Sequence, residues 1–404
     1  MFNHYPMENK HQILIIGGGN AGISVASKLL LKDNSLNISI IEPSEKHYYQ
    51  PAWTLVGAGD FNISDTVKAE KDFMPKEVNW IKDSVVELAP EKNQLTLKSG
   101  TILNYEFLIV APGIQLNWDE IKGLKETLGK NNVTSNYSFE TAPYTFECLK
   151  NFKGGNAIFH TPNTPIKCGG APMKIMFMAS DYLKKHNLLN KTKVAFWSGG
   201  TRIFAVEKYE NTFKKVFQRY GITPHFHQKL VEIDGPNKRA KFIGLGPDNK
   251  DVETWVDFDF IHVTPPQSAP DFVRNSSIAN AAGWVDVDKN TLQHITFKNI
   301  FSLGDASSLP TSKTGAAIRK QAPVLVENLL ATLRNQALTA TYNGYTSCPV
   351  LTGYGKLVLA EFDYTNTPTE TFPFDQSKER YSMYLLKKYI LPFLYWTRIL
   401  QGKM

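Results

Sequence analysis

Short apolar runs, glycine turns and helical patterns alternate along the first part of the chain. The run 12–16, QILII, predicts a buried strand, the turn 17–22 is rich in glycine, and an amphipathic helix pattern follows to about Lys32. A second apolar run, 38–41, ends at Glu42. This order of strand, turn, helix and strand predicts a βαβ unit with parallel strands.

The rest of the chain continues this pattern. We expect further strands over 85–88, 95–97, 107–110, 193–197 and 300–303, and helices over 173–183 and from about Gly315. Strands that alternate with helices are typical of a parallel sheet covered on both faces. The sequence therefore predicts an α/β fold.

Composition and charge narrow the class of protein. The chain has 404 residues, of which 42% are hydrophobic and 21% charged, so disordered and collagen-like classes are excluded. The net charge of +7 is dispersed and contains no long basic run, so we expect no nucleic-acid partner. Three cysteines without a CxxC or Cys/His cluster exclude a disulfide scaffold and predict no metal site.

The glycine turn carries a dinucleotide-binding pattern. Gly17 permits the tight turn, Gly19 lets a pyrophosphate approach the backbone, and Gly22 permits close packing of helix on strand. A carboxylate about 20 residues beyond the last glycine accepts the ribose hydroxyls, and Glu42 has this position. The acidic residue favours FAD or NAD over NADP. The residues assigned to the cofactor here are Gly17, Gly19, Asn20, Ala21, Gly22 and Glu42.

Later segments make the chain resemble the flavoproteins with two dinucleotide-binding domains, the disulfide reductase superfamily. The strand 107–110 ends in Ala111-Pro112-Gly113, and the strand 300–303 ends in Gly304-Asp305. In that superfamily the first motif binds FAD and a late Gly-Asp meets its ribityl or phosphate part. The resemblance implies tandem Rossmann-like domains and assigns Ala111, Gly113 and Asp305 to FAD. Lys313 is assigned to the flavin edge, where a cation stabilises reduced flavin.

The second nucleotide motif is degraded. After the strand 193–197 the turn reads Ser198-Gly199-Gly200-Thr201-Arg202-Ile203, with a single glycine at a required place. The segment 224–228, where the next strand ends, has no acidic residue for a ribose. We therefore expect a middle domain that keeps the fold and has lost its nicotinamide site.

Two cysteines are candidates for the electron donor site. Cys168 follows Lys167 and precedes Gly169-Gly170 and the predicted helix, and a helix N-terminus with Lys167 and Lys174 nearby favours a thiolate. Cys348 stands before Pro349 in what we expect to be a loop. Cys148 falls in a helical pattern and is expected to be a passive buried thiol.

With these motifs, HYYQP at 47–51, LPTSKT at 309–314 and FPFDQSKER at 372–380 make the chain similar to the sulfide:quinone oxidoreductases, and most to their mitochondrial-type branch. The resemblance spans about residues 11–397. It implies that hydrogen sulfide attacks a bridged pair formed by Cys168 and Cys348, and that two electrons pass through non-covalently bound FAD to a quinone. By analogy Cys348 carries the persulfide and Cys168 is the thiolate that attacks the flavin.

The resemblance also implies partners and a location. The quinone is ubiquinone or menaquinone, and a small acceptor such as glutathione or sulfite removes the sulfur. The apolar, aromatic segment 381–400, with Lys387, Lys388 and Arg398, suits binding to a membrane surface as two short helices divided at Pro392. Without a signal peptide or transmembrane helix, we expect a peripheral protein of the bacterial cytoplasmic membrane. A homo-oligomer stays open.

The expected domains are a split FAD domain, 1–115 and 283–340, a second Rossmann-like domain, 116–282, and a C-terminal quinone and membrane module, 341–404. The main rival is a type II NADH:quinone oxidoreductase, which needs the second glycine motif and no cysteine pair. A flavocytochrome-type sulfide dehydrogenase and a non-catalytic FAD-binding membrane scaffold are further alternatives.

Overall fold

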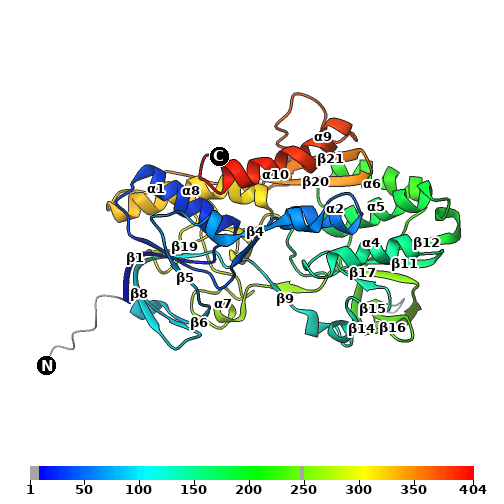
Figure 1. Cartoon of the computed structure of the whole chain (residues 1–404), viewed down its shortest axis with the longest axis horizontal. Helices are drawn as coiled ribbons and strands as arrows, with labels where there is room; N and C mark the ends of the chain where they lie inside the picture. The colour runs from blue at the N-terminus through cyan, green and yellow to red at the C-terminus, as the bar shows by residue number, and fades with distance from the viewer. Residues whose placement is uncertain (1–8, 246–249) are drawn as a thin grey trace.

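The computed structural model describes residues 9–245 and 250–404. Two α/β lobes lie side by side, and the C-terminal segment runs across both of them (Figure 1). The first lobe contains the N-terminal strands and the second contains the middle of the chain.

A seven-stranded sheet forms the centre of the first lobe. Its strands are β1 (Lys10–Ile16), β2 (Ile38–Ile41), β5 (Asn79–Ile81), β6 (Val85–Ala89), β7 (Gln94–Leu97), β8 (Ile102–Val110) and β19 (Ile300–Ser302). The strands β5, β2, β1, β8 and β19 are parallel, and β6–β7 adds an antiparallel hairpin. Because β1 is buried between β2 and β8, its residues Ile13 to Ile16 are all apolar.

Helices α1 (Asn20–Lys32) and α8 (Gly315–Leu333) pack together on one face of this sheet (Figure 1). The predictions of both helices and of the strands 38–41, 85–88, 95–97 and 107–110 are confirmed to within a few residues. Helix α8 begins at a side-chain cap, because Thr314 Oγ1 accepts from the Ala317 N–H at 3.1 Å.

The second lobe contains a parallel five-stranded sheet. Its strands are β10 (Val133–Thr134), β11 (Gly155–Thr161), β12 (Thr192–Ser198), β13 (Thr223–His225) and β17 (Phe260–Val263). This lobe also contains the helices α4 (Ala142–Asn151), α5 (Ala171–Lys185) and α6 (Glu207–Tyr220). A small antiparallel sheet is formed by β14 (Gln228–Asp234), β15 (Arg239–Leu245) and β16 (Asp251–Asp257). The lobe thus has the expected Rossmann-like strand and helix alternation.

Short elements connect these layers. They are β3 (Lys46–Tyr48), β4 (Val67–Ala69), β9 (Gln115–Leu116), β18 (Gln267–Ser268), α2 (Trp53–Gly57), α3 (Leu124–Thr127) and α7 (Asp271–Arg274). The pair β9–β18 links the two crossings between the lobes.

The C-terminal part begins with the antiparallel pair β20 (Thr346–Gly353) and β21 (Lys356–Phe362). The expectation that Cys348 lies in a loop is therefore wrong. Cys348 pairs with Ala360, and the alternating Ser/Thr and small residues around it were not a clear strand pattern in the sequence.

The chain ends in a helical run from Tyr381 to Ile399, formed by α9 (Tyr381–Leu385), α10 (Leu391–Leu394) and the π-helical turns 386–390 and 395–399. The predicted division at Pro392 is wrong. A π turn directly precedes the proline and changes the backbone bonding there, so the helical path continues. No helix among residues 9–245 and 250–404 is long and apolar enough to cross a membrane.

Candidate active site

The glycine turn between β1 and α1 has the geometry of a phosphate cradle. Gly17 has φ +99°, and a side chain there would collide with the Ala111 carbonyl oxygen. A Cβ on Gly22 would collide with the Gly17 carbonyl oxygen. A Cβ on Gly19 would meet nothing within 4 Å, so the backbone there faces open space at the start of α1. These residues fit a dinucleotide pyrophosphate, with Asn20 and Ala21 forming the first turn of the helix.

Glu42 stands at the end of β2, directly beside this turn. Its Oε2 accepts from the Gly18 N–H at 2.8 Å and its Oε1 from the Ser44 N–H at 2.7 Å. Burial raises the pKa of Glu42, while these two hydrogen bonds oppose the rise. Each carboxylate oxygen has a second lone pair, so the side chain can still accept from ribose hydroxyls.

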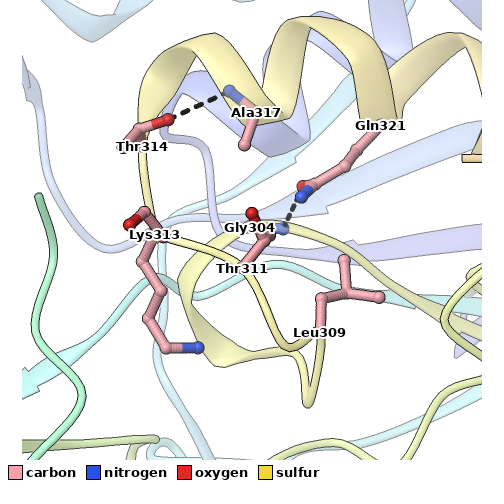
Figure 2. A pocket seen from close by; sticks show the side chains of 8 residues that line it. Gly304, Leu309, Thr311, Lys313, Thr314, Ala317 and Gln321 are labelled. Carbon is pink, nitrogen blue, oxygen red and sulfur yellow. Dashed lines mark hydrogen bonds between the residues drawn. The ribbon is translucent and has the colours of Figure 1, made fainter. Parts of the chain in front are cut away.

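The other residues assigned to FAD lie around the ends of β8 and β19. Ala111 follows β8 and touches the glycine turn, and Gly113 takes φ +79°. Asp305 lies in the 3-10 turn Gly304–Ala306 after β19. Figure 2 shows this region, where Gln321 accepts from the Gly304 N–H at 2.9 Å and Thr314 caps α8.

Lys313 lies beside these residues and is nearly buried. Its Nζ donates to the Ser307 carbonyl at 3.0 Å and stands 3.9 Å from the ring centroid of Trp284. Burial lowers the pKa of Lys313 to about 8, and Asp305 opposes this effect. Burial also lowers the pKa of Lys167 to about 8, and Asp305 again opposes this effect. Both lysines thus interact with the Asp305 carboxyl group.

The structure brings the two candidate cysteines together. Cys168 precedes α5 and Cys348 lies in β20, and their Sγ atoms are 3.8 Å apart. Cys168 has φ +54°, a left-handed conformation that costs energy for a residue with a side chain. Its N–H donates to the Lys313 carbonyl at 2.8 Å, which ties the cysteine loop to the first lobe. A Cβ on Gly170 would stand 2.6 Å from Cys348 Sγ, so only glycine fits there.

The surroundings of the two thiols differ. The hydrogen bond from Cys348 and the Lys174 ammonium, whose Nζ is 2.9 Å from Cys168 Sγ, hold the pKa of Cys168 well below its ordinary value. The interaction with Cys168 and burial raise the pKa of Cys348. Cys168 is therefore the thiolate of the pair. Cys148 is buried in α4, and burial raises its pKa to about 11, which agrees with a passive thiol.

Lys387 is a site residue that the sequence pattern placed wrongly. We expected it to face lipid headgroups, but it is 3% exposed and its Nζ donates to the Pro51 carbonyl at 2.7 Å. The pKa of Lys387 is lowered to about 7. Burial is the main cause and the Lys174 charge adds to it, while both cysteine sulfurs oppose the lowering. The segment is apolar on every side, so its helical spacing does not indicate which side chains point inward. A second lysine therefore lies near the sulfur pair.

A cavity of about 610 Å³ opens next to the cysteine loop. It is lined by the segment from Thr161 to Gly169, by the turn from Ser198 to Ala205 and by the loop from Ser307 to Lys313. The degraded nucleotide turn thus forms a wall of a cavity that reaches the residue after Cys168. A molecule of a few hundred Å³ fits this space.

Glu210 explains why the second turn is unsuited to a dinucleotide. Its Oε1 accepts from the Ile203 N–H at 3.2 Å and the Phe204 N–H at 3.4 Å, and Arg202 Nη2 lies 2.6 Å from its Oε2. Arg202 and other hydrogen bonds lower the pKa of this 4% exposed carboxyl to about 2. A permanent carboxylate occupies backbone amides near the start of α6, which in a dinucleotide site bind phosphate.

Aromatic side chains of the C-terminal part have different surroundings. Phe362 lines the cavity beside the cysteine loop, Tyr364 packs on Tyr342, and Phe372 stacks on Phe374. The Tyr354 hydroxyl donates to the Ala58 carbonyl at 2.5 Å. Among residues 9–245 and 250–404, no group of His, Cys, Asp and Glu could hold a metal ion.

Comparisons with known proteins find similar chains. A family model described as pyridine nucleotide-disulphide oxidoreductase matches residues 11–145. The chain is 49% identical over 400 residues to the mitochondrial sulfide:quinone oxidoreductase of Dictyostelium discoideum, with 98% of this chain and 87% of that protein covered. The mitochondrial sulfide:quinone oxidoreductase of Mus musculus is 44% identical over 396 residues, with 98% and 87% covered.

A solved structure supports the fold. The sulfide:quinone oxidoreductase of Aquifex aeolicus superposes with a TM-score of 0.82 at 20% identity, covering 97% of this chain and 92% of that one. The matches to three curated relatives, at 39–49% identity over 96–98% of this chain, show that the chain belongs to the sulfide:quinone oxidoreductase family.

Proposed function

We propose that this protein oxidises hydrogen sulfide at Cys168 and Cys348 and passes two electrons through a flavin to a membrane quinone. The observation that carries the proposal is the pair of sulfur atoms, 3.8 Å apart, next to the residues of a dinucleotide site. The family membership and the chemistry of the site support it.

Non-covalent FAD is the flavin that fits this chain. Gly17 and Gly22 permit the tight turn and its packing, and Gly19 leaves open space that would take the pyrophosphate. Glu42 would accept from the ribose hydroxyls, and Asp305 and Lys313 would supply charge near the flavin. When bound, FAD supplies two-electron redox chemistry between a thiolate and a quinone. No cysteine other than the reacting pair lies near the glycine turn in the described part of the chain, since Cys148 is in α4 of the second lobe.

The two thiols have different roles. With the pair oxidised to a disulfide, HS⁻ attacks the sulfur of Cys348, the S–S bond breaks, and Cys348 becomes a persulfide while Cys168 leaves as a thiolate. The better-stabilised thiolate leaves faster, and the Lys174 ammonium, 2.9 Å from Cys168 Sγ, stabilises the thiolate of Cys168. Attack in this direction agrees with the assignment of Cys348 as persulfide carrier and Cys168 as the thiolate that faces the flavin.

A small sulfur acceptor would enter through the cavity of about 610 Å³. Glutathione or sulfite fits this space, and either presents a nucleophilic atom to the persulfide. Lys313 lies in the lining, and its ammonium suits an anionic acceptor. The same cavity leaves no dinucleotide seat, because Glu210 binds the amides of Ile203 and Phe204. This argues against the NADH:quinone oxidoreductase alternative.

The terminal helical run suits a membrane surface. Its outward side chains are apolar, with Tyr389 58%, Ile390 49% and Phe393 61% exposed, and Arg398 is an exposed cation of the same run. Ubiquinone or menaquinone would reach the flavin from this side. The three curated relatives with 39–49% identity are named mitochondrial, and these names do not support the expectation of a bacterial cytoplasmic membrane.

The proposed functions divide among three parts of the chain. We assign FAD to residues 1–115 with 283–340, the cysteine loop and cavity wall to 116–282, and the quinone and membrane functions to 341–404. Association into a homo-oligomer stays an expectation.

Single serine substitutions test the cysteine roles. Cys168→Ser and Cys348→Ser should each lower sulfide-dependent reduction of a soluble quinone at least a hundredfold while FAD stays bound. Cys148→Ser, the matched control, should keep activity within about twofold. Activity within a few-fold of the wild type in either of the first two variants would remove the cysteine pair from the mechanism.

A further inference from the structure

A buried hydrogen-bond chain joins the terminal helical run to the first lobe. His47 lies between Glu70 and Tyr395, with Nδ1 2.9 Å from Glu70 Oε2 and Nε2 2.6 Å from the Tyr395 hydroxyl. The three residues are 2%, 2% and 6% exposed. A carboxylate only accepts, so the imidazole donates from Nδ1 and accepts the Tyr395 O–H at Nε2.

Aromatic rings enclose this chain. The ring of Phe73 lies 5.7 Å and that of Trp396 5.6 Å from the His47 ring, and Tyr49 lies 4.8 Å from Tyr395, measured between centroids. These rings exclude water, and hydrogen bonds are stronger in such an environment than at the surface. The enclosure therefore keeps the hydrogen bonds among Glu70, His47 and Tyr395 in one geometry.

The end of the chain is held on α1, the helix that starts at the glycine turn. Ser24 Oγ donates to the Ile399 carbonyl at 3.2 Å, Ser27 Oγ to the Leu400 carbonyl at 2.7 Å, and Lys28 Nζ to the Gly402 carbonyl at 3.0 Å. Figure 1 shows the C-terminus ending close to α1. These donors satisfy carbonyl groups that the end of a helical run leaves free.

Glu70 connects this network to the cofactor turn. Its Oε1 is buried without a hydrogen-bond partner and lies 2.9 Å from where a Cβ on Gly18 would stand. The Gly18 N–H in turn donates to Glu42. Glu70 therefore packs against the Gly17–Gly22 turn, beside the Gly18 amide that donates to Glu42.

We propose that His47 and Tyr395 are positioning residues for FAD, which act through Glu70 on the Gly17–Gly22 turn, so that the terminal run is a structural part of the cofactor site. The inference rests on the proposed FAD site. Coupling between two sites is reciprocal, so bound FAD must also stabilise the docked position of residues 395–402 by the same factor.

Tyr395→Phe in the full-length protein tests the proposal, and Tyr389→Phe, which removes a hydroxyl from the exposed side of the same run, is its matched control. We expect the apparent Kd of FAD, from flavin fluorescence on adding FAD to apoprotein, to rise about fivefold to tenfold in Tyr395→Phe and to stay within twofold in Tyr389→Phe. Glu70→Gln should weaken binding as well. The double variant should bind no more weakly than the weaker-binding single variant, because both substitutions interrupt the same chain from Tyr395 through His47 to Glu70.

Hydrogen exchange gives a readout that a merely structural role would not change. Exchange of the amides of residues 395–402 should slow when FAD binds the wild type, and this slowing should be lost in Tyr395→Phe. Equal FAD affinity in Tyr395→Phe and the wild type, or exchange unaffected by FAD, would overturn the proposal. Should Tyr395→Phe fail to fold, Glu70→Gln replaces it with the same expected outcomes. A wild type that does not bind FAD would instead refute the proposed cofactor site.

Discussion

The Nζ of Lys174 lies 2.9 Å from the Sγ of Cys168, two residues brought together by the first turns of α5. The lysine is 4% exposed. Burial alone would lower its pKa, but the sulfur of Cys168 raises it, so the ammonium form persists beside the thiolate. The pair is the main electrostatic feature of the cysteine loop.

Replacing Lys174 with methionine should raise the pKa of Cys168 by about one to two units, because a charge-assisted hydrogen bond of about 1.5–3 kcal/mol to the thiolate is lost. The pH dependence of alkylation in the reduced protein measures this pKa. Lys185→Met on the same helix, where the lysine is exposed and paired with Asp181, is the control. An unchanged alkylation profile in Lys174→Met would contradict this electrostatic account.

Alanine substitutions separate folding from cofactor binding at the glycine turn. Gly22→Ala would force a methyl group onto the Gly17 carbonyl and should lower the unfolding temperature of the apoprotein, whereas Gly19→Ala adds its methyl group to open space. Gly19→Ala should keep that temperature and weaken FAD binding about tenfold or more, because its methyl group points into the pyrophosphate seat. Unchanged FAD affinity in Gly19→Ala would argue that the phosphates bind elsewhere.

Much of the fold could be predicted from the sequence because its signals are local. The run 12–16, the glycine turn and Glu42 lie within one βαβ unit, and their strand and helix periods agree with their burial. Cys168 was found through its glycines and lysines. The meeting of Cys168 and Cys348 depends on the packing of β20 against α5, which no local pattern encodes, and only the family resemblance paired them.

The direction of side chains in the terminal run could not be predicted. Both of its faces are apolar and aromatic, so periodicity does not separate buried Tyr395 and Trp396 from exposed Tyr389 and Phe393. Lys387 could not be placed for a similar reason, because no sequence pattern marks a lysine that is buried beside sulfur atoms. The sequence shows only the loss of glycines from the second nucleotide turn, so the hydrogen bonds from this turn to Glu210 could not be predicted.

Membrane binding should depend on the exposed apolar side chains of this run. Ile390→Ser with Phe393→Ser should lower partition into vesicles containing anionic lipid at least tenfold, because burial of each side chain contributes about 1.5–3 kcal/mol. Ile102→Ser, which changes a 50% exposed residue of β8, is the control. Truncation after Gln376 is a poorer test, since it also removes buried Lys387, Tyr395 and Trp396. Equal partition of all variants would place the membrane contact elsewhere.

Lys387 makes stability depend on pH. Its folded pKa of about 7 lies below the ordinary value of 10.5, so between these values the unfolded chain binds more protons and the free energy of unfolding rises with pH. Below pH 7 the buried lysine costs the fold up to about 5 kcal/mol. Lys387→Met should therefore be more stable than the wild type at pH 6, and this gain should shrink toward pH 10.

Denaturant unfolding of Lys387→Met and of the wild type at matched pH values measures this difference. Cys168, Cys348 and Lys174 are present in both proteins, so their titration cancels in the comparison. Lys388→Met, which breaks the 2.7 Å contact with Asp60, is the control and should show no such slope. A stability difference independent of pH would contradict the buried, neutralised state of Lys387.

The most direct test of the central claim is the anaerobic absorbance of the bound flavin after sulfide or NADH is added to the FAD-loaded protein. We predict that sulfide bleaches the flavin band of the wild type within seconds, that Cys168→Ser and Cys348→Ser stay unbleached, and that NADH leaves the wild-type band unchanged. Rapid bleaching by NADH, or bleaching by sulfide in either cysteine variant at a rate near that of the wild type, would contradict the account.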